Sequence, residues 1–283
     1  ESKVVEMLKS KGINKKDLNR DEFLKYAMDW KDEYGGIIIK QLKKLGCSCD
    51  WDRETFTMDE GYSKAVLTAF VNLYKKGIIY RGNRLVNWCP ISQSAISDEE
   101  VIYREIKGKL WYFKYPIKGL KEFIVVATTR PETMLGDSAV AINPGDKRFK
   151  HLIGESVILP LVDKEIPIIS DDFVDPEFGT GCVKVTPAHD PNDFVIGQRH
   201  NLLFTSIMKE DGSLNLNVPK KYQGLTREKA REIILLDIEN LGLLEKVEDY
   251  THQVGFSERG NVPIEFYMSK QWFMKMSDLS KPA

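Results

Sequence analysis

The spacing of apolar residues changes from helical to alternating about a quarter of the way along the chain. Before residue 78, apolar positions recur every three to four residues in "DEFLKYAMDWKDEYGGIIIKQLKKLG" and in "TMDEGYSKAVLTAFVNLYKKG". This period predicts two helices that end near Gly46 and Gly77, and Thr57 and Glu60 have the spacing of a capping box for the second helix. The N-terminal part of the chain is therefore expected to be helical.

From Ile78 onward, the pattern of apolar and polar residues predicts short strands. "IIYRGNRLVNW" predicts a hairpin around Gly82 and Asn83. Two helices are expected within the β region, from Asp190 to about residue 202 and from residue 226 to 241. Short strands separated by turn residues are typical of a barrel or a sandwich. The expected strands are "KLWYFKYPI", "EFIVVAT", "SAVAINP", "SVILPLV", "EIPIIS" and "GCVKVTP".

Composition narrows the class of protein. The 283 residues carry a net charge of −1, which excludes a globally basic nucleic-acid binder, although a local basic path could remain. No apolar run has the length of a membrane span, and the charged N-terminal segment has no signal-peptide core. Four scattered cysteines argue against a disulfide scaffold. We therefore expect a cytoplasmic protein with no membrane partner.

A first polar cluster interrupts the apolar stretch "VVATTRPETMLGDSAV". It brings Thr128, Thr129, Arg130, Glu132 and Thr133 together between two expected strands. A plain hairpin would place Gly, Asn or Asp at its tip. Taken alone, the cluster is still explained best as a turn capped by hydroxyl groups.

A second polar cluster lies in "GTGCVKVTPAHDPND". Strand alternation places Lys184 and Thr186 on one face, just before His189, Asp190 and Asp193. Helix capping explains an acid at position 190 or 193, because both fall in the first turn of the expected helix. Capping does not explain why a lysine, a threonine and a histidine gather there. We therefore favour a functional site.

The cysteines and the other histidines give no comparable signal. Cys182 lies between Gly181 and Val183 in an expected strand, where a small buried apolar side chain is the usual role. No spacing of histidine and cysteine forms a convincing metal set. No metal site is predicted.

Together, "VVATTRPETMLGD" and "FGTGCVKVTPAHDPNDFVIGQRHNL" resemble the editing domain of class I aminoacyl-tRNA synthetases, in the form found in their valyl-specific members. "WKDEYGGIIIKQLKKLGCSCDWDRETFTMDE", "LYKKGIIYRGNRLVNWCP" and "VPIEFYMSKQWFMKM" extend the resemblance over nearly the whole chain. The ATP-handling signatures of the class, of the His-Ile-Gly-His and Lys-Met-Ser-Lys-Ser types, are missing. The resemblance thus implies an editing insertion with flanking helices of the catalytic domain, without the aminoacylation site.

The implied fold is α+β, with an editing β-barrel and flanking helices. The expected domains are a helical segment at 1–82, an entering stem at 83–112, the barrel at 113–250 and an exit stem at 251–283. Relatives often bind zinc in these stems through four cysteines. Here Cys89-Pro90-Ile91-Ser92 and Phe256-Ser257-Glu258-Arg259 retain one thiol, which cannot hold a tetrahedral zinc.

The implied activity is hydrolysis of threonine mis-esterified to tRNA(Val), which would support the fidelity of valyl-tRNA formation. No cofactor is expected in this fragment, whereas the full-length enzyme is expected to use ATP and magnesium. The rest of the synthetase chain is an expected partner. Two alternatives remain: a non-catalytic module that binds the tRNA acceptor end, and the editing domain of an isoleucyl or leucyl relative. The resemblance implies catalytic roles for Asp193, Lys184 and Thr129, and substrate binding by Thr128, Thr129, Arg130, Thr133, Lys184, Thr186, His189, Asp190 and Asp193.

Overall fold

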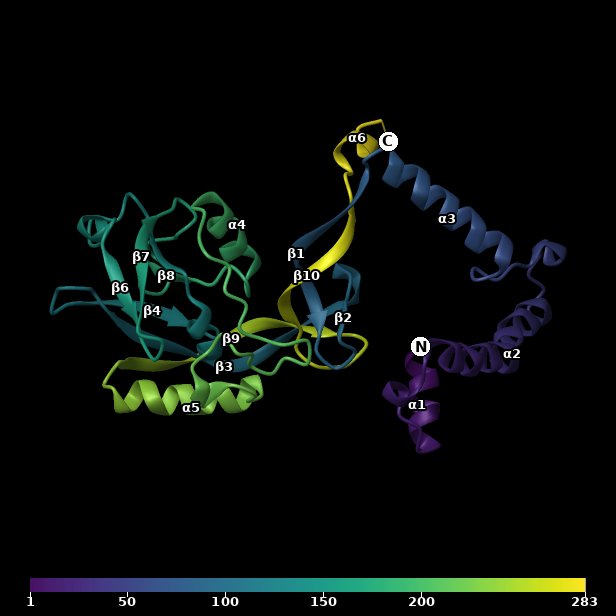
Figure 1. Ribbon diagram of the computed structural model, residues 1–283, viewed down its shortest axis with the longest axis horizontal. Coiled ribbons are helices and arrows are strands. Elements are labelled where there is room, and N and C mark those ends of the chain that lie inside the picture. The colour runs from purple at the N-terminus through teal and green to yellow at the C-terminus, as the bar shows by residue number, and fades with distance from the viewer. Residues whose placement is uncertain (283) are drawn as a thin grey trace. The chain divides into compact units, whose positions relative to one another are not determined.

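Helices make up the N-terminal part of the chain in the computed structural model, which describes residues 1–282 (Figure 1). This part contains α1 (Ser2–Ser10), η1 (Lys15–Asp17), α2 (Arg20–Lys44), η2 (Trp51–Arg53) and α3 (Glu60–Lys75). Both predicted helices are confirmed, and Gly46 and Gly77 follow them with φ of 77° and 69°. The left-handed conformation that ends each helix favours glycine.

The predicted capping box of α3 is wrong. The residue before the helix is Asp59, and its Oδ2 accepts a hydrogen bond from the N–H of Phe56 at 2.9 Å. A carboxylate turned back toward the preceding residue leaves the first amides of the helix uncapped by it. In contrast, α2 has a complete capping box between Asn19 and Glu22.

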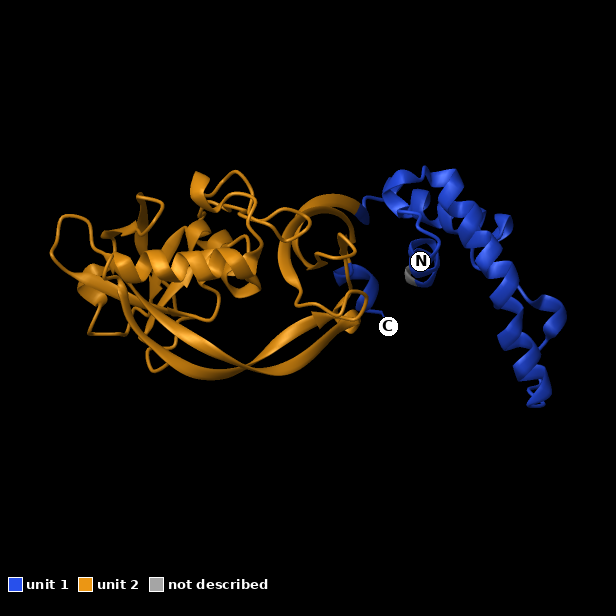
Figure 2. Cartoon of the chain, turned by 90° about the horizontal axis from the view of Figure 1, so that it is seen from below, with its two compact units in different colours: residues 1–79, 276–283 blue, residues 80–275 orange. Residues whose placement is uncertain are grey.

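The chain divides into two compact units, 1–79 with 276–283 and 80–275, which Figure 2 distinguishes by colour. The first unit also contains α6 (Ser277–Ser280). The expected boundaries at 112/113 and 250/251 fall inside strands that run through them. Within residues 1–282, no helix has both the length and the apolar character needed to cross a bilayer.

The second unit holds all the strands described and two helices longer than one turn. The strands are β1 (Ile79–Cys89, which begins one residue before the unit), β2 (Ser94–Ala95), β3 (Val101–Pro116), β4 (Phe123–Thr128), β5 (Ala139–Ile142), β6 (Ser156–Leu159), β7 (Lys164–Ser170), β8 (Cys182–Val185), β9 (Leu244–Ser257) and β10 (Glu265–Met274). The helices are α4 (Pro191–Arg199) and α5 (Arg227–Asn240), and the 3₁₀ turns are η3 (Asp98–Glu100), η4 (Pro131–Gly136), η5 (Lys150–Leu152) and η6 (Lys220–Tyr222).

These strands form three sheets with the orders β10-β1-β2, β4-β3-β9 and β6-β7-β5-β8. The long strands β3 and β9 pair antiparallel from Val101 opposite Ser257 to Phe113 opposite Leu244. In the four-stranded sheet, β5 pairs parallel with β7 and antiparallel with β8. The six strands quoted from the sequence are therefore present.

The expected closed barrel is not seen, because the described sheets remain separate ladders. Local contacts join the second and third sheets. Ile117 and Val157 form an isolated antiparallel bridge, and the hydroxyl of Thr180 donates to the carbonyl of Val125 at 2.6 Å. These bonds stop short of the continuous ladder that closes a barrel. The fold is a mixed α+β arrangement of facing sheets.

A shared apolar core fills the space between these two sheets and α5. It includes Phe113 and Ile124 from one sheet, Ile142 and Ile168 from the other, and Ile234 from α5, each at most 1% exposed. A smaller core lies on the other face of β5 and β8. Helix α4 contributes to that smaller core, so the sheet is covered on both faces.

The predicted hairpin at Gly82 and Asn83 is wrong. Both residues lie inside β1, which continues without a turn to Cys89 and neighbours β10 in its sheet. Local turn residues are overridden here by pairing with a strand nearly two hundred residues away. The segment after Tyr250, expected as the exit stem, supplies the end of β9 and all of β10.

Candidate active site

The loop between β4 and β5 is a buried 3₁₀ turn. All six residues of η4 are buried. The Oγ1 of Thr128 accepts a hydrogen bond from the N–H of Arg130 at 3.0 Å, and the hydroxyl of Thr133 donates to the carbonyl of Arg130 at 3.0 Å. These two threonines therefore hold the loop in shape, while Thr129 is half-buried and borders a cavity.

Lys184 and Thr186 belong to a buried polar cluster around Asp137. The Nζ of Lys184 donates to Oδ1 of Asp137 at 3.1 Å and to Oγ1 of Thr186 at 2.5 Å. The hydroxyl of Thr186 donates to the same carboxylate oxygen at 2.5 Å, and the hydroxyl of Tyr115 donates to Oδ2 at 2.7 Å. Burial raises the pKa of Asp137, an effect that Lys184 and the two hydroxyls oppose. Among the described residues, Lys184 thus uses two of its three N–H donors and keeps one to spare.

Asp190 and Asp193 have different roles at the start of α4. Oδ1 of Asp190 accepts hydrogen bonds from the N–H groups of Asn192 and Asp193, so Asp190 is the N-cap. The carboxylate of Asp193 instead accepts the N–H of Thr186 through Oδ2 at 2.8 Å. Among the described residues, its Oδ1 accepts no hydrogen bond. Asp193 therefore does not cap the helix with its side chain, and half of its carboxylate is free.

The environment of Asp193 disfavours its negative charge. The residue is 8% exposed. Burial and the neighbouring charge of Asp190 raise its pKa to about 7, against the opposing effects of Lys184 and the Thr186 N–H. A cation that entered beside Oδ1 would remove this penalty by pairing with the carboxylate.

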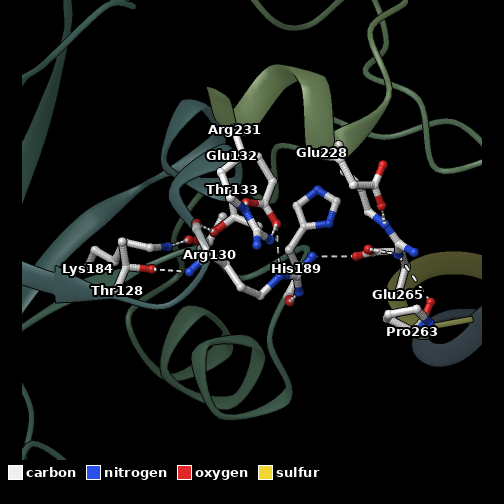
Figure 3. A network of polar contacts seen from close by, with 12 residues as sticks. Thr128, Arg130, Glu132, Thr133, Lys184, His189, Glu228, Arg231, Pro263 and Glu265 are labelled. Atoms are coloured by element: carbon white, nitrogen blue, oxygen red, sulfur yellow. Dashed lines mark hydrogen bonds and ion pairs between the residues drawn. The ribbon is translucent and has the colours of Figure 1, made fainter. Parts of the chain in front are cut away.

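Arg130 is held by two buried carboxylates (Figure 3). Its guanidinium pairs with Glu132 at 3.3 Å and forms a short contact with Glu265 on β10. Arg231 on α5 binds Glu132 through two hydrogen bonds, and Arg227 contacts Glu265. Burial lowers the pKa of Arg130, but Glu265 and Glu132 outweigh it and raise that pKa. The positive and negative charges alternate, so each buried charge has a partner.

His189 is placed as a structural residue. The residue is 1% exposed, and Nε2 of its ring accepts the N–H of Ile207 at 2.9 Å. Burial, followed by the charges of Arg130 and Lys184, lowers the pKa of His189 to about 3. Its carbonyl accepts a hydrogen bond from Nη1 of Arg130 at 3.2 Å. A neutral, enclosed ring that accepts the N–H of Ile207 supports this part of the chain.

Two cavities lie beside these residues. One of about 430 Å³ is bordered by Thr129 and Arg130 and by residues of β3, β9, α5 and β10, including Trp111. The other, of about 390 Å³, is bordered by Asp137, Leu203 and Thr205. Among the described residues, neither lining includes Asp193. The first cavity is large enough for a nucleoside-sized group and has an aromatic ring in its wall.

In the stem, the exit positions beside Cys89 are Ser257 and Gly260, one residue later than the Phe256 and Arg259 of the expected Cys-x-x-Cys register. Sγ of Cys89 accepts the N–H of Ser92 at 3.4 Å, and burial opposes ionisation of the thiol while hydrogen bonds with Ser257 and Ser92 lower its pKa. A Cβ at Gly260 would lie 2.9 Å from this sulfur, which identifies Gly260 as the fourth position. One thiol with two hydroxyls and a glycine does not fit a structural zinc.

Some members of the site were missed from the sequence. Asp137, Tyr115 and Glu265 are central to the contacts above but were not predicted. Asp137 ends the polar stretch that follows β4, so its position beside the other polar residues was a usable signal. Tyr115 lies in an expected strand and Glu265 in a segment that was quoted only for the resemblance, and neither position carries a local signal for the site.

Comparisons with known proteins place this architecture in a family. The family model for class I tRNA synthetases (I, L, M and V) matches residues 1–283. A valine–tRNA ligase of Parabacteroides distasonis is 56% identical over 283 residues, covering 100% of this chain and 32% of that protein. A valine–tRNA ligase of Synechocystis is 55% identical over 276 residues, covering 98% of this chain and 30% of that protein. The chain spans about a third of the length of the curated relatives it matches.

A solved structure is also similar in part. It is a LeuRS of Agrobacterium radiobacter in a ternary complex with tRNA and LeuAMS, 18% identical with a TM-score of 0.40, covering 93% of this chain and 39% of that chain. The match of the family model along the whole length decides the assignment. The chain belongs to the class I aminoacyl-tRNA synthetases, and over its full length it is similar to valine–tRNA ligases.

Proposed function

We propose that this chain hydrolyses the ester that joins threonine to the terminal adenosine of tRNA(Val). The observation that carries the proposal is the half-free carboxylate of Asp193 beside the Lys184–Thr186 cluster. An aminoacyl ester carries a free ammonium group, and a partly desolvated carboxylate is suited to bind it. The similarity to valine–tRNA ligases supports threonine as the amino acid to be removed.

Threonine and valine have nearly the same shape, so a second polar site is needed to separate them. A valyl-specific synthetic pocket is a known example of this limit and rejects threonine only about a hundredfold. A polar pocket that binds the threonyl hydroxyl disfavours valine, because buried polar groups left unpaired cost about 1–3 kcal/mol each. Asp190, the spare donor of Lys184 and Thr186 are the groups we assign to this hydroxyl.

The remaining assignments concern the adenosine and the water. Thr129 and Arg130 border the cavity of about 430 Å³, which we assign to the terminal adenosine. Thr128 and Thr133 act on this group through the shape of the loop. Attack by a positioned water near the adjacent ribose hydroxyl is sufficient for a labile ester, so no protein nucleophile is assigned.

The proposal extends to the longer enzyme. There, valine would be joined to tRNA(Val) with ATP and magnesium at a site outside this fragment, and the cytoplasm, where translation takes place, would be its location. Removal of threonine would then support the fidelity of the product.

The test is incubation of the purified chain with threonyl-tRNA(Val) and, separately, with valyl-tRNA(Val). Selective release of threonine supports the proposal. Binding of tRNA without release of either amino acid would instead indicate a module that binds the acceptor end. The variant Lys184→Met removes a donor assigned to the threonyl hydroxyl and should lower the release of threonine, whereas release at the parent rate would contradict this assignment.

A further inference from the structure

Glu265 connects the site to the strand by which the chain leaves the unit. It is the first residue of β10 and is 3% exposed. One carboxylate oxygen contacts Nη2 of Arg130, and the other contacts Nη1 of Arg227. Arg227 is fixed in turn, because the same Nη1 donates to the carbonyl of Pro263 at 3.1 Å. Glu265 is therefore itself rigidly placed.

The guanidinium of Arg130 is oriented by three groups from three parts of the fold. Its Nε pairs with Glu132 in the same loop, and its Nη1 donates to the carbonyl of His189. Its Nη2 contacts Glu265 in the stem. A planar guanidinium that is bound on three sides has one orientation, and removing one side releases it.

The position of Arg130 also fixes the backbone around the site. Its N–H and carbonyl bond to the hydroxyls of Thr128 and Thr133, which shapes the β4–β5 loop. Its contact with the carbonyl of His189 joins this loop to the residue directly before Asp190. A shift of the Arg130 guanidinium would thus move both the β4–β5 loop and the segment before Asp190.

We propose that Glu265 is a positioning residue: it sets the orientation of Arg130, and through Arg130 it aligns the β4–β5 loop with the start of α4. The catalytic consequence rests on the proposed hydrolysis. Glu265 does not touch the substrate in this scheme. From β10, Glu265 holds the β4–β5 loop and the start of α4 in a fixed position relative to each other.

The principal variant is Glu265→Gln. The amide keeps the shape of the side chain and one acceptor oxygen, but it turns an NH₂ group toward one of the two arginines. The matched control is Asp237→Asn on α5, which removes a carboxylate bound by Lys221 and Tyr222 without contacting Arg130. Glu265→Asp keeps the charge and shortens the side chain, and it is available if the glutamine variant does not fold.

Two readouts are compared in the parent and the variants. The first is hydrogen–deuterium exchange of the amides in residues 128–137. The second is kcat and KM for hydrolysis of threonyl-tRNA(Val). For Glu265→Gln we expect faster exchange in the loop and a kcat lower by about 10- to 100-fold, with little change in KM, as a small misplacement of binding groups predicts. Glu265→Asp should give smaller changes of the same kind, and Asp237→Asn should give neither.

Unchanged exchange in residues 128–137 would overturn the positioning role, whatever the activity does. Faster exchange with hydrolysis at the parent rate would overturn its catalytic consequence, as would equal effects in Asp237→Asn. If the parent chain releases no threonine, the proposed function fails in this chain. The exchange experiment then still decides whether Glu265 positions the loop.

Discussion

Replacing Asp193 by asparagine separates the electrostatic role of this side chain from its structural role. The amide oxygen of asparagine can still accept the N–H of Thr186, which Oδ2 of the carboxylate accepts at 2.8 Å. The substitution removes the negative charge, which burial and Asp190 disfavour. We therefore expect a variant that folds normally and no longer binds an ammonium group at this place.

The expected effect on stability depends on pH and has a definite sign. The pKa of Asp193 rises from 3.8 to about 7 in the folded protein. Between these values the unfolded chain is ionised while the folded chain retains its proton, so the free energy of unfolding falls as the pH rises. Above pH 7, this shift lowers the free energy of unfolding by at most about 4 kcal/mol relative to its value at acid pH. The asparagine variant lacks this term.

The assay is urea unfolding of the parent and of Asp193→Asn at about pH 5 and at about pH 8, followed by circular dichroism of the β-rich unit. The variant should gain about 2–3 kcal/mol relative to the parent between the two pH values. Hydrolysis of threonyl-tRNA(Val) should fall by orders of magnitude in the same variant. A stability difference that does not widen with pH would refute the desolvated carboxylate, and hydrolysis at the parent rate would refute the ammonium site.

Three further predictions concern the supporting structure. Tyr115→Phe removes the donor to Oδ2 of Asp137 and should lower the free energy of unfolding by about 1–3 kcal/mol, measured in urea; an unchanged value would show that this bond is dispensable. Gly136→Ala places a Cβ 2.9 Å from the carbonyl of Thr205 and should destabilise the unit by about 1–3 kcal/mol, whereas an unaffected melting temperature would contradict this packing. Elemental analysis of the untagged chain should find zinc well below one atom per molecule at the Cys89 position, and stoichiometric zinc would overturn this.

Strand alternation correctly predicted that Lys184 and Thr186 share one face, where both bond to Asp137. Cys182 packs in the larger core, while Val183 and Val185 pack in the smaller one on the opposite face. The prediction succeeded because a slip by one residue would move Lys184 away from Asp137 and into the smaller apolar core on the opposite face. The two polar clusters could be located for the same reason, since polar residues interrupt otherwise apolar strands.

The division of work within those clusters could not be predicted. Thr128 and Thr133 bond to the backbone of Arg130, and a hydroxyl that faces inward has the same sequence signature as one that faces a ligand. The carboxylate of Glu265 contacts Arg130, which is 135 residues away in the sequence. Such a pairing depends on how β10 passes the loop, which local periodicity does not contain. Closure of the barrel failed as a prediction for a similar reason, because it depends on ladders between strands distant in sequence.

The pairing of β1 with β10 has a consequence for how such a unit could be acquired. The chain enters through β1 and leaves through β10, and near those ends the rings of Tyr80 and Phe273 are 5.9 Å apart. Neighbouring strands are about 4.8 Å apart, so the two ends of a segment of nearly two hundred residues lie close together. For a host domain, such an interruption resembles a short surface loop, and its closure entropy does not grow with the size of what is inserted. A folded unit of this size could therefore be added to an existing protein, or exchanged between proteins, without rebuilding the fold that receives it.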